Sequence, residues 1–267
     1  MKNQNIDKLE SINKRPVYKT WIRINKIIIF SVISLLLILI ALLPINLFIR
    51  IISGILALPF IYISFIIIYS YYQFAEFGGN FQSKIHNLIV DRIRLRENTK
   101  VLDIGAGSAA LTIKIAKTLI DSSFIGIDYW GEDWEYSKSI CEMNAKYEGL
   151  EDSINFIKAS ASNLPFVDNE FDVIVSCLTF HEVKDERDKI KVFKEALRVL
   201  KKEGEFVFLD LFLDEKIFGN NNKFFYEINS IGLSEVKVEK LKDIIDLPTI
   251  LLNKKVLGNA AIISGRK

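Results

Sequence analysis

The stretch that decides the fold is residues 101–110, which read Val-Leu-Asp-Ile-Gly-Ala-Gly-Ser-Ala-Ala. Its first residues are the apolar, branched types of a short buried strand. At Gly105 and Gly107 the backbone must bend sharply, and a ligand can approach without meeting a Cβ atom. The apolar stripe of residues 111–119 predicts a helix packed on a sheet. A strand that feeds a helix through a glycine turn is a nucleotide-binding element, because helix N–H groups point at the ligand.

Asp103 distinguishes a dinucleotide site from a site for a cationic cofactor. The glycine pattern also fits the dinucleotide fingerprint, with Ala110 in its third glycine place. Asp103 lies at the end of the strand, two positions before the first glycine. Its carboxylate would repel a diphosphate and attract a cofactor that carries an ammonium or sulfonium group. The stretch therefore favours a cationic cofactor, and a strand–turn–helix without a ligand is the alternative.

The acidic-x-Gly-x-Gly motif of Asp103, Gly105 and Gly107 resembles the first motif of class I S-adenosylmethionine-dependent methyltransferases. The resemblance extends over about residues 85–267 and implies S-adenosylmethionine as the cofactor. It also implies an α/β fold, namely a Rossmann-like, seven-stranded methyltransferase sheet whose last strand is antiparallel. The dinucleotide interpretation, an NAD-dependent oxidoreductase, is the less favoured one.

A second strand, residues 124–128, ends in Asp128. Asp128 follows Gly105 at close to the roughly 20-residue interval that brings an acid to the ribose hydroxyls in such units. Neighbouring strands bring this carboxylate beside the first turn, where its hydrogen bonds to hydroxyls would be strong. Tyr129 follows directly and is expected to cover the adenine face or a substrate. For the aromatic run 129–136, packing or membrane contact is the alternative.

A third strand over residues 154–159 leads into a loop that contains Leu-Pro-Phe at 164–166. In the methyltransferases that the chain resembles, this loop usually carries an Asp that receives the adenine amino group. Here the matching position is Ser160, whose hydroxyl can accept the same bond without charge. The N–H of Ala161 can still reach a ring nitrogen.

The remaining elements follow in the order that the family resemblance implies. We expect strands at residues 171–177, 205–210, 234–241 and 256–264, helices at 190–200 and 224–231, and a turn at 201–204. The apolar segment 244–252 is left unassigned, and would cap the substrate side or touch a membrane.

His181, just past the fourth strand, is the candidate catalytic base. Methyl transfer is an in-line displacement, so the protein mainly aligns donor and acceptor and excludes water. A base is needed only if the acceptor must lose a proton. In the family a His here often serves structure, which is the alternative. Cys141 and Cys177 have no CxxC spacing, so we predict small buried residues and no metal site.

Two charge-free runs, residues 27–49 and 51–75, each exceed the roughly 18 residues that make a membrane-span candidate. Pro44 and Asn46 mark a turn between them. We therefore predict a transmembrane helical hairpin over 27–75. A signal peptide is the competing interpretation of the first run, but no small-residue cleavage site stands out and a second span follows at once.

The hairpin divides the chain into a basic lead-in at residues 1–26, a linker and lead-in helix at 76–99, and a methyltransferase domain at 100–267. The helix in 76–99 would cover the sheet edge or lie on the membrane surface. Lys and Arg flank both ends of the hairpin, whereas its turn holds only Arg50. The positive-inside rule then predicts a two-span protein of the cell membrane with a cytoplasmic methyltransferase domain.

The composition agrees with this organisation. The chain is 50% hydrophobic, and its mean hydropathy is +0.22. A formal charge of +2 gives no electrostatic basis for binding nucleic acid. We expect a membrane-anchored methyltransferase whose partners are the lipid bilayer and a small or lipophilic acceptor. A non-catalytic membrane scaffold that retains the nucleotide-binding fold is the alternative. The acceptor and the oligomeric state are left open.

Overall fold

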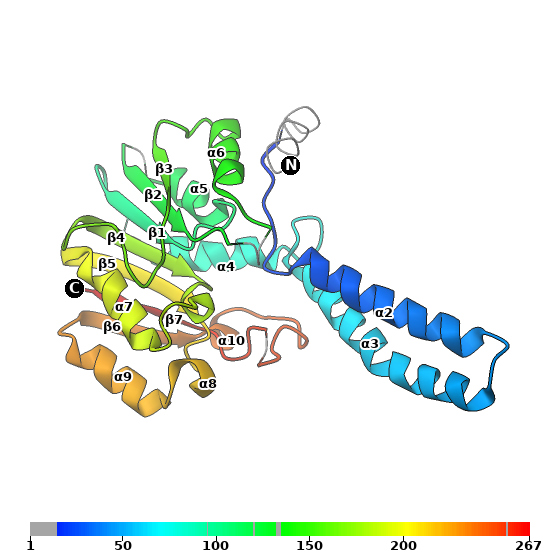
Figure 1. Cartoon of the computed structure of the whole chain (residues 1–267). Helices are drawn as coiled ribbons and strands as arrows, with labels where there is room; N and C mark the ends of the chain where they lie inside the picture. Colours follow the sequence, from blue (N-terminus) through cyan, green and yellow to red (C-terminus); the bar gives the residue numbers. More distant parts are fainter. Residues whose placement is uncertain (1–14, 95, 120, 132–134, 255) are drawn as a thin grey trace. The chain divides into compact units, whose positions relative to one another are not determined.

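The computed structural model describes residues 15–94, 96–119, 121–131, 135–254 and 256–267. These residues form two compact units. One comprises Thr20–Lys84, and the other comprises residues 15–19 together with Ile85–Lys267. The smaller unit is a helical hairpin, and the larger one is an α/β domain (Figure 1).

The helical unit consists mainly of α2 (Ile24–Leu42) and α3 (Leu47–Phe74), which pack side by side along their length (Figure 1). Asn46 begins α3, because its side chain accepts a hydrogen bond from the Phe48 N–H at 2.8 Å. At the same turn Arg50 Nε donates to the Ala41 carbonyl at 3.0 Å, which satisfies a carbonyl near the end of α2. The predicted pair of apolar helices is therefore confirmed, and both are long and apolar enough to cross a membrane.

The polarity of the helical unit is inverted relative to a water-soluble hairpin. Small polar residues face the partner helix: Ser34 and Ser64 are buried, with their hydroxyl oxygens 3.4 Å apart. Large apolar side chains face outward, such as Leu35 at 56% exposed and Ile55 at 62%. Close packing of small residues with an apolar exterior is the pattern of helices that associate in lipid.

The α/β domain is built on one seven-stranded sheet of order β3-β2-β1-β4-β5-β7-β6. Strand β7 pairs antiparallel with both β5 and β6, and the other neighbours are parallel. The predicted sheet is confirmed. Its strands are β1 (Lys100–Ile104), β2 (Ser123–Asp128), β3 (Ile154–Lys158), β4 (Phe171–Cys177), β5 (Leu200–Asp210), β6 (Ser234–Lys240) and β7 (Ala261–Arg266).

Helices flank this sheet (Figure 1). They are α4 (Phe81–Val90), α5 (Ala110–Ala116), α6 (Lys138–Tyr147), the 3-10 helix η1 (Phe180–Glu182), α7 (Lys189–Arg198), α8 (Glu215–Phe218), α9 (Asn221–Ser230) and α10 (Leu241–Ile244). In α4, Ile85 and Ile89 are fully buried, which favours the interpretation of this segment as a helix that covers the sheet. Both cysteines are buried and free, as predicted.

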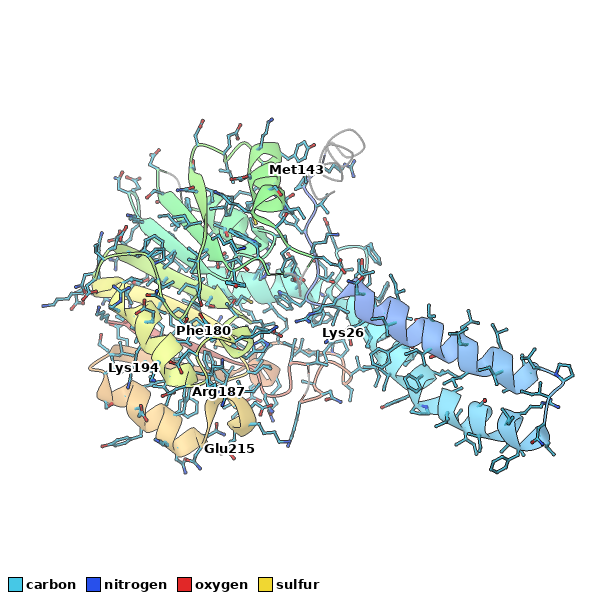
Figure 2. All side chains as sticks on the ribbon, viewed as in Figure 1. Lys26, Met143, Phe180, Arg187, Lys194 and Glu215 are labelled. Atoms are coloured by element: carbon cyan, nitrogen blue, oxygen red, sulfur yellow. The ribbon has the colours of Figure 1, made fainter. Side chains whose placement is uncertain are left out.

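A cluster of phenylalanines fills the core between the sheet and α7. Phe193 of α7 meets Phe208 of β5 edge-to-face, with ring centroids 5.2 Å apart. Phe180, labelled in Figure 2, meets the same Phe208 ring at 5.1 Å and is fully buried. Aromatic pairs in this geometry stabilise a core beyond their buried area. The cluster therefore anchors η1, the element that carries His181.

Several boundaries differ from those predicted by a few residues, and the largest differences concern β5 and β7. Residues 201–204 are not a separate turn but belong to β5, which begins at Leu200. The strand absorbs them as an irregularity: Glu203 has φ +62°, its N–H donates to the Lys267 carbonyl, and the β4–β5 register shifts nearby. The last strand begins at Ala261 rather than near residue 256, because the preceding residues form turns. Leu247, Leu251 and Leu257 are buried there, which explains the apolar character of this region.

Candidate functional site

The glycine turn lies at the carboxyl end of β1 and is fastened to β2. The N–H groups of Gly105 and Ala106 both donate to the Ile127 carbonyl, at 2.8 and 2.9 Å. The N–H of Gly107 donates to Asp128 Oδ2 at 2.9 Å. Helix α5 then begins at Ala110. The turn and the predicted ribose acid are thus brought together, although they lie on different strands.

The two glycines of the turn have different structural roles. Both have positive φ, +86° at Gly105 and +57° at Gly107, which disfavours a side chain. A Cβ on Gly105 would overlap with the Thr179 side chain, so this glycine permits close packing of the β4–η1 loop. Among the described residues, the atoms nearest to a Cβ on Gly107 would be those of the Tyr136 ring, at an ordinary 3.7 Å. Within the described part of the chain, packing is therefore looser at Gly107 than at Gly105.

Asp103 is a buried carboxylate that is only half satisfied. Its side chain is 1% exposed, and Oδ2 accepts a hydrogen bond from the Thr112 hydroxyl at 2.5 Å. Among the described residues, Oδ1 has no hydrogen-bond partner. Burial raises the pKa of Asp103 to about 7. The hydrogen bond from Thr112 lowers this pKa, and the negative charge of Asp128 raises it further. An unpaired buried oxygen is costly, and a cation would relieve that cost.

The buried, unpaired Oδ1 of Asp103 distinguishes between two classes of cofactor. S-Adenosylmethionine carries a sulfonium and an ammonium group, and either would supply the missing positive charge. The diphosphate of NAD would add negative charge beside a carboxylate that is already poorly solvated. The residues present therefore fit S-adenosylmethionine and disfavour a dinucleotide.

Asp128 stands at the carboxyl end of β2 with both oxygens engaged. Oδ2 accepts from Gly107, and Oδ1 accepts from the Trp130 N–H at 2.8 Å. Burial raises the pKa of Asp128, and these backbone hydrogen bonds oppose the rise. Each carboxylate oxygen has a second lone pair, which leaves acceptor capacity for ribose hydroxyls. Tyr129 is 66% exposed, with the Lys158 ammonium 5.4 Å from its ring centre.

The predicted adenine loop adjoins Asp128, because the Ala159 N–H donates to the Asp128 carbonyl at 3.1 Å. Ser160 Oγ lies 2.9 Å from Ser162 Oγ, so its hydroxyl already belongs to a local network. Ala161 is buried. The structure thus brings Ser160 and Ala161 to the same edge of the sheet as Asp103 and Asp128.

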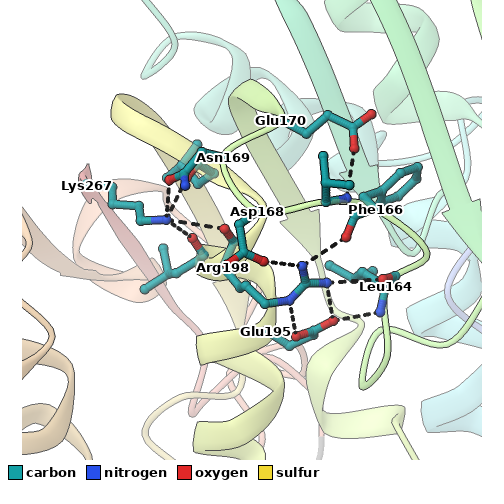
Figure 3. Close-up of polar contacts among 11 residues, drawn as sticks. Leu164, Phe166, Asp168, Asn169, Glu170, Glu195, Arg198 and Lys267 are labelled. Carbon is teal, nitrogen blue, oxygen red and sulfur yellow. Dashed lines mark hydrogen bonds and ion pairs between the residues drawn. The ribbon is translucent and has the colours of Figure 1, made fainter.

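Arg198 holds the rest of this loop in place (Figure 3). Its guanidinium donates to the carbonyls of Leu164 and Phe166, at 3.1 and 2.9 Å. It also pairs with Glu195 and Asp168, at 2.9 and 2.7 Å. Glu195 in turn accepts the Leu164 N–H at 2.8 Å. A planar donor fork that satisfies two carbonyls and two carboxylates fixes the path of the loop.

His181 lies on η1, at the carboxyl end of β4. Its Nδ1 is 2.6 Å from Asp210 Oδ1, and its Nε2 is 3.7 Å from Glu182 Oε1. Burial alone would lower the pKa of His181, but the charge and hydrogen bond of Asp210, with Glu182, raise it above the ordinary value. The other histidine, His86, is buried on α4, and burial with Lys114 nearby lowers its pKa to about 3.

Sequence reasoning missed two side chains that hold the glycine turn. The indole Nε1 of Trp130 and the thiol of Cys141 both donate to the Gly107 carbonyl, at 3.0 and 3.1 Å. The aromatic run after Asp128 did raise Trp130 as a candidate, but without this role. Nothing in the spacing of Cys141 indicated a contact with a residue far earlier in the chain.

A third contact, between Asn144 and the described end of the lead-in, was also missed. Asn144 is fully buried, accepts the Val17 N–H at 2.7 Å and donates to the Val17 carbonyl at 3.0 Å. It also donates to the Ser108 carbonyl at 2.9 Å, while Ser108 Oγ accepts the Lys19 N–H at 3.2 Å. Residues 15–19, which we call the strap, are therefore hydrogen-bonded to Asn144 of α6 and to Ser108 next to the glycine turn. This part of the basic lead-in is thus held against the α/β domain, and residues 1–14 lie outside the described residues.

Comparison with known proteins gives the family. Residues 95–248 match the family described as "Methyltransferase domain", and this match covers more than half of the chain. The chain belongs to this family. It is 31% identical over 128 residues to an uncharacterized methyltransferase, YcgJ, of Bacillus subtilis, covering 48% of this chain and 47% of the relative.

Two further similarities concern named C-methyltransferases. The chain is 33% identical over 141 residues to the ubiquinone/menaquinone biosynthesis C-methyltransferase UbiE of Rickettsia prowazekii, covering 51% of this chain and 52% of the relative. The fold resembles the crystal structure of geranyl diphosphate C-methyltransferase from Streptomyces coelicolor in complex with S-adenosyl-L-homocysteine, with a TM-score of 0.53 and 12% identity. That likeness covers 69% of this chain and 79% of the other. The chain spans about half the length of the curated relatives it matches.

Proposed function

We propose that the protein is an S-adenosylmethionine-dependent methyltransferase that works at a membrane on a small, lipophilic acceptor. Membership of the methyltransferase family supports the reaction class. The observation that carries the proposal is the buried, unpaired Oδ1 of Asp103 beside the glycine turn, because it fits a cationic nucleotide. The fold alone would be equally compatible with a scaffold protein that binds no cofactor.

Each site residue has a task in this reaction. When bound, S-adenosylmethionine supplies a methyl group already activated by its sulfonium. Asp103 neutralises a cofactor cation, Asp128 accepts the ribose hydroxyls, and Ser160 with Ala161 meets the adenine edge. The cofactor lies against the backbone of Gly107, and Tyr129 covers part of its exposed side. These contacts hold the donor aligned, which is the main contribution that an in-line displacement requires.

The lipophilic acceptor is supported by two independent features. Helices α2 and α3 expose apolar side chains over most of their length, and they are linked to the domain within the same chain. The UbiE relative is named for quinone biosynthesis, and the geranyl diphosphate enzyme for a prenyl substrate. A tether at the bilayer raises the local concentration of an acceptor that partitions into lipid.

The proposed location is the cell membrane, with both ends of the hairpin on the cytoplasmic side. Basic residues flank the hairpin on both sides, among them Lys19, Arg23, Lys26 and Lys84. The turn between the helices contributes only Arg50. This asymmetry is what the positive-inside rule uses to assign orientation. The buried, unpaired state of both cysteines suits a reducing compartment.

The test is a search for the labelled product. Membranes containing the full-length protein are incubated with methyl-labelled S-adenosylmethionine, and extracted lipids, quinones and water-soluble metabolites are analysed by mass spectrometry. Membranes with the Asp103→Asn variant are the matched control. We expect label in a lipid-extractable compound with the wild type only. Label confined to water-soluble compounds would contradict the acceptor class, and cofactor binding without any product would favour the scaffold.

A further inference from the structure

Asp210 and His181 form a pair at the edge of the sheet where the cofactor turn lies. Asp210 is the last residue of β5 and is 1% exposed. Its Oδ1 is 2.6 Å from His181 Nδ1, shorter than most nitrogen–oxygen hydrogen bonds. Since an ionised carboxylate can only accept, Nδ1 must carry the proton in this contact.

The orientation of Asp210 is fixed by the backbone. Its Oδ2 accepts the Phe180 N–H at 2.7 Å, and its Oδ1 accepts the Leu211 N–H at 2.7 Å. Phe180 is itself fully buried in the aromatic core. The carboxylate is therefore held on both oxygens before it meets the imidazole, which makes it a rigid partner. A neutral imidazole bonded in this way has its free lone pair on Nε2.

The pair also lies near the cofactor turn. In the sheet, Ile104 pairs with Ser176 and Ser176 pairs with Phe208, so the ends of β1, β4 and β5 stand in register. Two strand spacings of roughly 4.8 Å then separate the end of β1 from the end of β5. Thr179, two residues before His181, packs directly on Gly105. His181 thus lies at the same end of the sheet as the cofactor turn.

We infer that Asp210 is a positioning residue that holds His181 as the Nδ1–H tautomer, so that Nε2 takes a proton from the methyl acceptor. This inference rests on the proposed function and narrows its substrate class. The acceptor is one that loses a proton as it is methylated, such as a phenolic hydroxyl or an activated C–H. A tertiary amine or a thioether, which carries no such proton, would have no use for this pair.

The proposed step moves one proton and one methyl group. Nε2 of His181 takes the proton from the acceptor X–H, and the electron pair of that bond forms the new X–CH₃ bond. The methyl–sulfur bond breaks, and its pair remains on sulfur, which gives S-adenosylhomocysteine. His181 leaves the step as an imidazolium paired with Asp210 and then releases its proton to solvent. No oxidant or other co-reactant is needed.

Three charged groups face the imidazole from the elements around it: Asp210 from β5, Glu182 from η1 and Lys189 from α7. Asp210 and Glu182 favour the protonated ring, and Lys189 opposes it. A test must therefore separate Asp210 from Glu182. The chain makes this tractable because it contains only two histidines. His86, with its strongly lowered pKa, serves as the internal reference.

The experiment is nitrogen-15 NMR of the full-length protein in detergent micelles, with labelled histidine. We expect wild-type His181 as the Nδ1–H tautomer above its titration midpoint. In Asp210→Asn the negative charge is lost and the amide oxygen has to serve the backbone N–H groups of Phe180 and Leu211, so the preference for Nδ1–H should weaken and the midpoint should fall. Glu182→Gln should lower the midpoint but keep the tautomer. A wild-type Nε2–H ring, or an Asp210→Asn variant with unchanged tautomer and midpoint, would overturn the inference.

Methylation of membrane extract with labelled S-adenosylmethionine gives the second readout. In Asp210→Asn the product-forming rate should fall at least tenfold, the KM for the cofactor should stay within about twofold, and the pH profile should move to lower pH. An unchanged rate in this variant would refute the positioning role. If the wild type forms no product while the NMR result holds, the proposed function fails and the tautomer assignment stands.

Discussion

Replacement of Asp103 by Asn should stabilise the protein without ligand. The carboxylate is buried with an unpaired oxygen, and its pKa rises from the ordinary 3.8 to about 7. At about 1.4 kcal/mol for each pKa unit, the charge costs roughly 4 kcal/mol of folding free energy at pH 8. The variant removes this charge, and its amide oxygen can still accept from Thr112.

The gain will be smaller than the full cost of the charge. In the variant, the amide N–H group takes the place of Oδ1, which has no hydrogen-bond partner among the described residues. A buried donor without a partner costs about 1–3 kcal/mol. We therefore expect the variant to be about 1–3 kcal/mol more stable than the wild type at pH 8. A site that sacrifices stability for a buried charge is built for function rather than for folding.

The stability difference between the variant and the wild type should depend on pH. Because the folded pKa of Asp103 lies above the unfolded one, the folded protein binds the extra proton between about pH 4 and pH 7. The wild type therefore loses stability relative to the variant as pH rises through this window, and the difference is constant above it. Below about pH 4 the charge is absent from both states, and the variant has no advantage.

The assay is guanidinium denaturation of the full-length proteins in detergent micelles, without cofactor, followed by tryptophan fluorescence at pH 5 and pH 8. Trp130 is buried beside the glycine turn and reports on the domain. The advantage of the variant should grow by about 2–3 kcal/mol between the two pH values. A variant less stable than the wild type at pH 8, or an advantage independent of pH, would refute the reasoning.

Three further outcomes are expected. Gly107→Ala should abolish S-adenosylmethionine binding in calorimetry and lower the thermal midpoint modestly, because its φ of +57° strains a side chain although the Cβ meets no described protein atom closer than 3.7 Å. Gly105→Ala, whose Cβ would also overlap with Thr179, should destabilise the fold more strongly. Asp128→Ala should weaken cofactor binding by about 1.5–3 kcal/mol, the range for a hydrogen bond to a charged group, and unchanged affinity would remove Asp128 from the site. Asn144→Ala should free the strap, so trypsin should cut after Lys19 several-fold faster than in wild type; equal cleavage rates would show that Asn144 does not hold it.

The sheet could be predicted from sequence because its signals are local. The apolar runs of β1 and β4, the glycine turn and the acid that ends β2 each lie within a few residues. Their family order then fixes the topology. The two long apolar helices were predicted for the same reason. The predicted strand boundaries were wrong where tertiary pairing overrides local signals. An example is Glu203 in β5, whose N–H donates to the carbonyl of Lys267.

The polar details of the site could not be predicted because they join distant residues. Asp210 at the end of β5 contacts His181, and Asn144 contacts Val17, which lies 127 residues earlier in the sequence. Spacing in one sequence carries no information about such pairs. The resemblance to methyltransferases did identify Asp103, but only the structure shows that one of its oxygens is left without a described partner.

The most direct measurement is calorimetric titration of full-length wild type and Asp103→Asn with S-adenosylmethionine at pH 6 and pH 7.5. With a pKa of about 7 for Asp103, wild-type affinity should rise roughly tenfold between these values, because the cation binds the ionised carboxylate. The variant should bind at least tenfold more weakly at pH 7.5 and show little pH dependence. Equal affinities for the two proteins at both pH values would contradict a cofactor cation held by Asp103.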